Sequence, residues 1–186
     1  RVPERLDAAE ACYRRAVELD PDYVKALYNL GNTLRQTGRL DEAEHCYRRV
    51  AAIDPHYTNA HNNLGVLLMD QGRHAEAEDV YRQLLSVAPD DAVALGNLGL
   101  CQLAQGRLAE AEASLRQALA LQPANPEARN NLGVALKQQG RMTEAEAEYR
   151  AVLDARPDHA EAHNNLGAVL KAQGRLAEAE DACLAA

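Results

Sequence analysis

Apolar residues recur along the chain at helical spacing, in pairs of amphipathic segments. In residues 24–57 the apolar face of the first segment is formed by Ala26, Leu27, Leu30 and Leu34, and that of the second by Leu40, Ala43, Tyr47, Val50 and Ile53. Steps of three and four residues are typical of helices with one buried face. Gly38 separates the segments and Pro55 follows the second. Because glycine favours the left-handed conformation that ends helices and proline cannot extend them, the pattern predicts an antiparallel helix pair.

This unit repeats every 34 residues without a slip. The step is kept by Pro21, Pro55, Pro89, Pro123 and Pro157, and by Gly31, Gly65, Gly99, Gly133 and Gly167. Such a period is typical of proteins in which each repeat packs only on its neighbours. We therefore expect one all-α array of tandem helix pairs over residues 1–186. Its parts are the second helix of a preceding repeat (1–23), full repeats at 24–57, 58–91, 92–125 and 126–159, and a truncated repeat at 160–186.

Two further features recur with the same period. A glycine inside a helix costs about 1 kcal/mol relative to alanine, so its recurrence at the Gly31 position predicts close contact between paired helices. Five Glu–Arg pairs at i,i+4 are Glu10–Arg14, Glu44–Arg48, Glu78–Arg82, Glu112–Arg116 and Glu146–Arg150. We interpret them as helix-supporting pairs on a solvated outer face.

The chain contains the run L-G-x-x-L, followed by Gly-Arg-Leu, Ala-x-x-x-Tyr and Pro. This pattern resembles the tetratricopeptide repeat family, and the resemblance covers essentially the whole chain. The resemblance implies a right-handed α-solenoid superhelix of tandem antiparallel helix pairs. The chain departs from the family pattern where a large aromatic residue is usual, at Leu27, His61, Leu95, Arg129 and His163. Gln102 also replaces a leucine, which predicts looser packing in the third full repeat.

An asparagine precedes each repeat glycine by two residues, at Asn29, Asn63, Asn97, Asn131 and Asn165. Asparagine is a poor helix former, so its recurrence needs a cause. A side-chain amide both donates and accepts, so it could bind the backbone of an extended peptide or bond a neighbouring helix. The residue type leaves both open. The resemblance favours peptide binding, because superhelices like that of O-linked N-acetylglucosamine transferase carry an asparagine ladder in this slot, lining an inner groove that holds substrate peptides.

Neighbouring positions on the same helical face complete the predicted peptide-binding groove. They are Asn32, Asn62, Asn130, Asn164, Lys25, Tyr28, Arg35, Met69, Leu103, Lys137 and Lys171. Gly96 leaves space where other repeats carry Tyr or Asn. Val66, Leu100 and Val134 either give the groove an apolar middle or bury against adjacent helices, and we expect the second.

Composition excludes several classes of function. The net charge of -8 opposes nucleic-acid binding, which needs a basic stripe. No apolar run approaches the roughly 20 residues of a membrane helix. Four cysteines contain no C-x-x-C pair, and the six histidines form no helical His-x-x-x-His pair. We find no catalytic triad, phosphate-binding loop or metal motif, so we predict no catalytic residue, metal or cofactor.

We therefore expect a non-catalytic, cytoplasmic scaffold that binds protein or peptide segments in extended conformation. It would bind no nucleic acid and insert into no membrane. One alternative is the substrate-recognition segment of a larger glycosyltransferase resembling O-GlcNAc transferase. A second is a structural array that self-associates through exposed terminal repeats.

Overall fold

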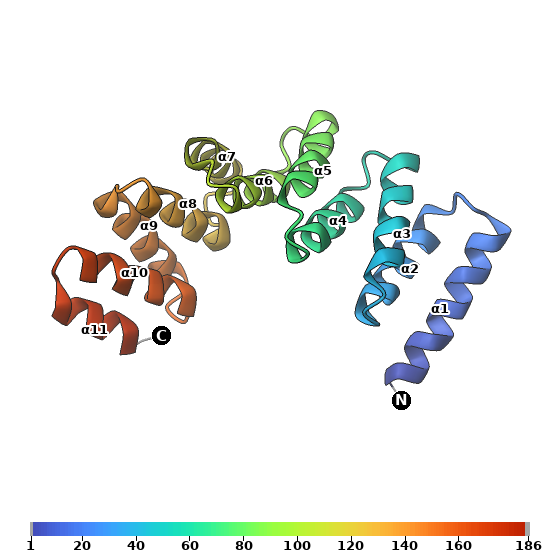
Figure 1. Cartoon of the computed structure of the whole chain (residues 1–186), viewed down its shortest axis with the longest axis horizontal. Helices are drawn as coiled ribbons and strands as arrows, with labels where there is room; N and C mark the ends of the chain where they lie inside the picture. Colours follow the sequence, from blue (N-terminus) through green and yellow to red (C-terminus); the bar gives the residue numbers. More distant parts are fainter. Residues whose placement is uncertain (1, 185–186) are drawn as a thin grey trace. The chain divides into compact units, whose positions relative to one another are not determined.

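The computed structural model describes residues 2–184 of the chain, and the side chains of residues 6–182. Every regular element in this range is an α-helix, and the chain divides after Pro89 into two compact units (Figure 1). The first unit contains α1 (Val2–Leu19), α2 (Val24–Gln36), α3 (Leu40–Ile53), α4 (Thr58–Asp70) and α5 (His74–Val87). The second contains α6 (Ala92–Ala104), α7 (Leu108–Leu121), α8 (Pro126–Gln138), α9 (Met142–Ala155), α10 (Ala160–Ala172) and α11 (Leu176–Leu184). The predicted all-helical fold of paired helices is confirmed.

A glycine with positive φ ends each first helix. Gly38 has a φ of 78°, and its N–H donates to the Arg35 carbonyl at 3.1 Å. The following N–H, of Arg39, reaches back to the Leu34 carbonyl at 2.9 Å. These bonds satisfy carbonyls that a helix end would otherwise leave unpaired, in the manner of a Schellman motif. Gly72, Gly106, Gly140 and Gly174 share the positive φ, which confirms their predicted role in turning the chain between paired helices.

The repeat glycines allow the two helices of a pair to touch. A Cβ added at Gly31 would lie 2.7 Å from Cε1 of Tyr47, and one at Gly133 would lie 2.5 Å from Cε1 of Tyr149. Both tyrosines are fully buried. No Cβ is normally tolerated at such distances, so the prediction of close helix contact is confirmed.

Departures from the family pattern are matched by changes in the facing helix. Gln102 is buried and accepts a hydrogen bond from the Ser114 hydroxyl at 2.8 Å. At the position where the sequence predicted looser packing, the structure therefore has a buried, hydrogen-bonded pair of polar side chains. Arg129 likewise meets a carboxylate, with its Nη1 2.9 Å from Oε2 of Glu148. Buried polar groups with such partners avoid the cost of unpaired desolvation.

The recurring Glu–Arg pairs are present, but their glutamates are not solvated. The exposed fraction of these side chains is only 7% to 16%. Four of them also bind the arginine that follows the turn glycine of the next repeat: Glu10 binds Arg39, Glu44 binds Arg73, Glu112 binds Arg141 and Glu146 binds Arg175. The predicted outer-face helix support is therefore too narrow an interpretation. Each of these four carboxylates joins two consecutive repeats.

Replacing one of these carboxylates should make the free energy of unfolding depend less steeply on pH in the acid range. Burial alone would raise the pKa of Glu112, but hydrogen bonds from Arg141, Gln139 and Arg116 together outweigh it and lower the pKa to about 2. A lowered pKa adds stability that is complete above the ordinary value of 4.5 and is lost as pH falls towards 2. Glu112→Gln should cost about 1–2 kcal/mol at pH 7, allowing for solvent screening, and nothing near pH 2.

The measurement is thermal unfolding followed by circular dichroism from pH 2 to pH 7. Glu161→Gln is the matched control, because Glu161 is exposed and makes no ion pair among the described residues. Parallel pH curves for the Glu112 variant and the wild type would contradict the proposed coupling.

Candidate functional site

The predicted groove face contains a cleft in the second unit, between the first helices α6 and α8. The cleft has a volume of about 260 Å³, near the lower end of ligand pockets. Its lining consists of Val93, Gly96, Asn97, Asn125, Glu127, Ala128 and Asn131. Two of the five ladder asparagines thus open into one cavity.

Asn97 and Asn131 have free amides. Both side chains are partly exposed, and neither makes a hydrogen bond with another described residue. Each therefore offers a donor and an acceptor to whatever enters the cleft. Asn29, in the first unit, is also partly exposed and leaves its side-chain amide without a partner in the described structure.

The side chain of Asn63, in contrast, is hydrogen-bonded to the preceding repeat. Its Nδ2 donates to Oδ1 of Asn32 at 2.8 Å and to the hydroxyl of Tyr28 at 3.2 Å. The Tyr47 hydroxyl donates to the same Asn32 oxygen at 2.8 Å. Oδ1 of Asn62, the residue before Asn63 in the sequence, is buried without a partner among the described residues. The polar groups of α2 and α4 therefore serve mainly to join two repeats.

Asn165 is tied in the same way within the second unit. Its Nδ2 lies 3.3 Å from Oδ1 of Asn130, and its Oδ1 accepts from Nζ of Lys137 at 3.2 Å. Asn130 and Asn165 are only 2% and 8% exposed. Their predicted contact with peptide is not supported by this geometry, because Asn130 and Asn165 are buried and bond each other between α8 and α10.

Asn131 differs from the hydrogen-bonded Asn63 and Asn165 in one earlier position. Asn63 and Asn165 each bond the side chain 35 residues before, which is Tyr28 in one case and Asn130 in the other. The residue 35 positions before Asn131 is Gly96, which has no side chain to offer. A Cβ placed on Gly96 would meet no atom within 4 Å. Gly96 therefore both opens the cleft and leaves Asn131 free.

The rest of the predicted set is spread between surface and interior. Lys25, Arg35, Asn164 and Lys171 are exposed, and Met69 is partly buried with its sulfur 3.3 Å from Nδ1 of His74. Leu103 is only 9% exposed, so it packs in the core rather than facing a ligand. The opposite correction applies to Val66 and Leu100, which were expected to bury and are 37% and 38% exposed.

The cleft lining also contains Glu127, on the predicted groove face, and Asn125, which the prediction missed. Asn125 accepts from the N–H of Ala128 at 3.0 Å and so caps α8. Burial would raise the pKa of Glu127, but hydrogen bonds from its own backbone and from Arg156 lower it, so the group is a carboxylate at neutral pH. The Asn-Pro pair before α8 was the available signal, because asparagine favours the position just before a helix.

The described part of the chain lacks the features of a metal site and of a membrane span. No group of three or more His, Cys, Asp or Glu side chains there could hold a metal ion. None of the helices within those residues is long and apolar enough to cross a bilayer. His61 and His163 are buried, as their core-type positions predicted, and His159 caps α10 by accepting from the Ala162 N–H.

Comparison with known proteins agrees with this fold. Models of the tetratricopeptide repeat match residues 57–124, and residues 4–58, 97–158 and 132–186. None of the curated proteins matches the sequence.

PilW, MamA and YrrB are among the solved structures that are similar to this chain. The type IV pilus biogenesis factor PilW superposes with a TM-score of 0.83 at 24% identity, covering 97% of this chain and 84% of PilW. MamA from Desulfovibrio magneticus RS-1 gives 0.77 at 19% identity, with 86% and 90% covered. YrrB, a repeat protein with an unusual peptide-binding site, gives 0.74 at 22% identity, with 92% and 90% covered. Together with the matches to the repeat models, the helix pairs place this chain in the tetratricopeptide repeat family.

Proposed function

We propose that this chain is a non-catalytic scaffold that holds extended protein segments against the first helices of its repeats. The observation that carries the proposal is the pair of unbonded amides, Asn97 and Asn131, in one cleft. An extended backbone presents N–H and C=O groups in alternation, and each amide can pair with one of either kind. YrrB, which shares the fold, is a peptide-binding protein, and this lends support by analogy alone.

The cleft also suggests which side chains the bound segment carries. Val93 and Leu100 are 46% and 38% exposed on α6, and Gly96 leaves room between them. A peptide residue with an apolar side chain would bury this surface. The Glu127 carboxylate at the edge is already paired with Arg156, so its charge is balanced within the chain. A segment that carries an apolar residue fits this arrangement.

Removing the free amides should weaken peptide binding without loss of stability. The double variant Asn97→Ala/Asn131→Ala breaks no hydrogen bond among the described residues and improves helix propensity. We expect unchanged or slightly higher melting temperature and about tenfold weaker peptide binding, since each amide contributes roughly 0.5–1.5 kcal/mol. Ligands would come from a displayed library of random 12-residue peptides selected on the wild-type chain, with affinities measured by fluorescence polarisation.

Two controls separate the cleft from its surroundings. Gln138→Ala removes an exposed amide from the same helix outside the cleft and should leave binding unchanged. Gly96→Asn introduces the residue found at the equivalent Asn62, Asn130 and Asn164 positions, so it should be tolerated, fill the cleft and weaken binding. Selected peptides that bind the double variant as tightly as the wild type would overturn the proposal.

A further inference from the structure

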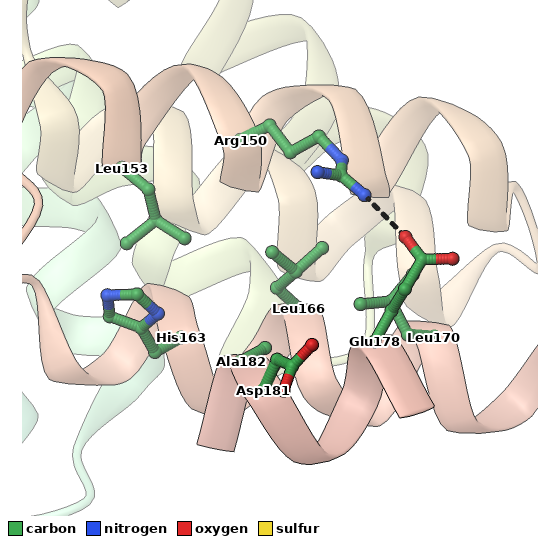
Figure 2. Close-up of a pocket in the computed structure, with 8 residues that line it drawn as sticks. All are labelled: Arg150, Leu153, His163, Leu166, Leu170, Glu178, Asp181 and Ala182. Carbon is green, nitrogen blue, oxygen red and sulfur yellow. Dashed lines mark hydrogen bonds and ion pairs between the residues drawn. The ribbon is translucent and has the colours of Figure 1, made fainter. Parts of the chain in front are cut away.

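A second cleft lies away from the ladder asparagines, where α9, α10 and α11 meet. Its volume is about 320 Å³ (Figure 2). Leu153, Leu166, Leu170 and Ala182 supply apolar walls, while Asp181 and the ion pair of Arg150 with Glu178 line the same cleft. An apolar cavity of about 150 Å³ is enough to hold benzene, so this cleft has room for a larger, bicyclic ring system.

One buried polar atom in the cleft lacks a partner. His163 is 9% exposed, and its Nε2 lies 2.7 Å from the carbonyl oxygen of Pro157. Its other nitrogen, Nδ1, is buried and bonds no described residue. Figure 2 shows the edge of the imidazole that carries Nδ1 turned towards Leu166 and the interior of the cleft. A buried polar atom without a partner costs stability, so its position facing a cavity suggests that a ligand completes it.

The contact with Pro157 determines whether Nδ1 of His163 donates or accepts a hydrogen bond. A carbonyl oxygen only accepts hydrogen bonds, so Nε2 carries the proton in this contact. In a neutral imidazole the other nitrogen is then an acceptor. The cleft therefore presents one buried imidazole acceptor beside its leucines, and this atom favours a ligand with an N–H or O–H donor.

The first unit has an equivalent cleft without this acceptor. It has a volume of about 310 Å³ and lies between α1, α2 and α3. Leu27 takes the place of His163 there, and Cys46 takes the place of Ala182. The shape is thus a property of the helix-pair packing, whereas the inward acceptor is particular to His163.

We propose that the His163 cleft binds a planar bicyclic aromatic group with one N–H donor, of the indole class. The ring would stack over Leu153, Leu166 and Leu170, and its N–H would donate to Nδ1 of His163. The proposal is independent of peptide binding at Asn97 and Asn131.

Indole itself is the probe, titrated into the full chain and followed by its own fluorescence, since the chain contains no tryptophan. We expect saturable binding of indole. The matched ligand 1-methylindole, which has no N–H, should bind about threefold to tenfold more weakly, as loss of one hydrogen bond predicts. N-acetyltryptophanamide tests whether the indole ring belongs to a free small molecule or to a tryptophan of a partner protein. Tighter binding than that of indole would support the same chemistry with a partner's tryptophan side chain as the occupant.

Two variants test the residues. His163→Leu introduces the residue present at the equivalent Leu27 and Leu95 positions, and it should lower indole affinity to the level of 1-methylindole. Ala182→Leu narrows the cleft from another wall and should weaken both ligands equally. Absence of saturable binding by indole and N-acetyltryptophanamide would overturn the proposal. Equal affinity of the wild type for indole and 1-methylindole would also overturn it, because the acceptor would then have no role.

Discussion

Replacing Gly133 with alanine is expected to lower the free energy of unfolding by about 2 kcal/mol. The added Cβ would lie 2.5 Å from Cε1 of Tyr149, whose ring is fully buried and cannot move into solvent. Overpacking of a core costs about 1–3 kcal/mol, and the better helix propensity of alanine offsets about 1 kcal/mol at most. Urea unfolding followed by circular dichroism measures the change.

Gly96→Ala is the matched control for this substitution. Gly96 also lies inside a first helix, but a Cβ there would meet nothing within 4 Å. The same chemical change should therefore stabilise the chain by about 1 kcal/mol, which puts the two variants about 3 kcal/mol apart. Combining Gly133→Ala with Tyr149→Ala should also cost less than the sum of the single changes, because the colliding ring is gone. Equal stabilisation by both alanines would show that helix contact is not what the repeat glycine provides.

The helix pairs could be predicted from sequence because their signals are local. Hydrophobic spacing, a turn glycine such as Gly38 and a proline such as Pro55 act within a few residues and repeat with one period. The contact between Gly31 and Tyr47 was also accessible, since only close approach justifies a glycine in mid-helix.

The state of each ladder asparagine could not be predicted in this way. The Asn165 amide is bonded by Asn130, 35 residues earlier on another helix, whereas the residue 35 positions before Asn131 is Gly96 and offers no side chain. The open space at Gly96 was predicted, but its consequence for Asn131 needed the geometry between adjacent first helices. The 34-residue period identifies equivalent positions in the repeats, but the side chains at those positions have different hydrogen-bond partners.

Burial of charge was missed for a related reason. An i,i+4 pair such as Glu112 and Arg116 looks complete within one helix, so sequence gives no cause to look for a second partner. Arg141 approaches the same carboxylate from the next repeat, with its Nη1 2.6 Å from Oε2. The glutamate is therefore enclosed by cations rather than exposed on an outer face.

Replacing tyrosine by phenylalanine should have opposite effects at two equivalent positions. Tyr47 and Tyr149 occupy the same slot and are both fully buried. Burial raises the pKa of Tyr47 to about 12 and that of Tyr149 higher still, which reflects how little water reaches either phenol. Tyr47 donates to Asn32 at 2.8 Å, whereas the Tyr149 hydroxyl bonds no described residue.

Tyr47→Phe should therefore cost about 1 kcal/mol, the net value of a typical hydrogen bond, while Tyr149→Phe should gain about 1 kcal/mol by removing an unpaired buried hydroxyl. The difference of about 2 kcal/mol is measured by urea unfolding of both variants under one set of conditions. Since both changes remove one oxygen from a buried ring, differences in ring packing largely cancel in the comparison. Two losses of equal size would mean that the Tyr149 hydroxyl is hydrogen-bonded in solution. A loss confined to Tyr47 would instead tie the Asn32–Asn63 network to the stability of the first unit, because that hydroxyl holds the shared Asn32 oxygen in place.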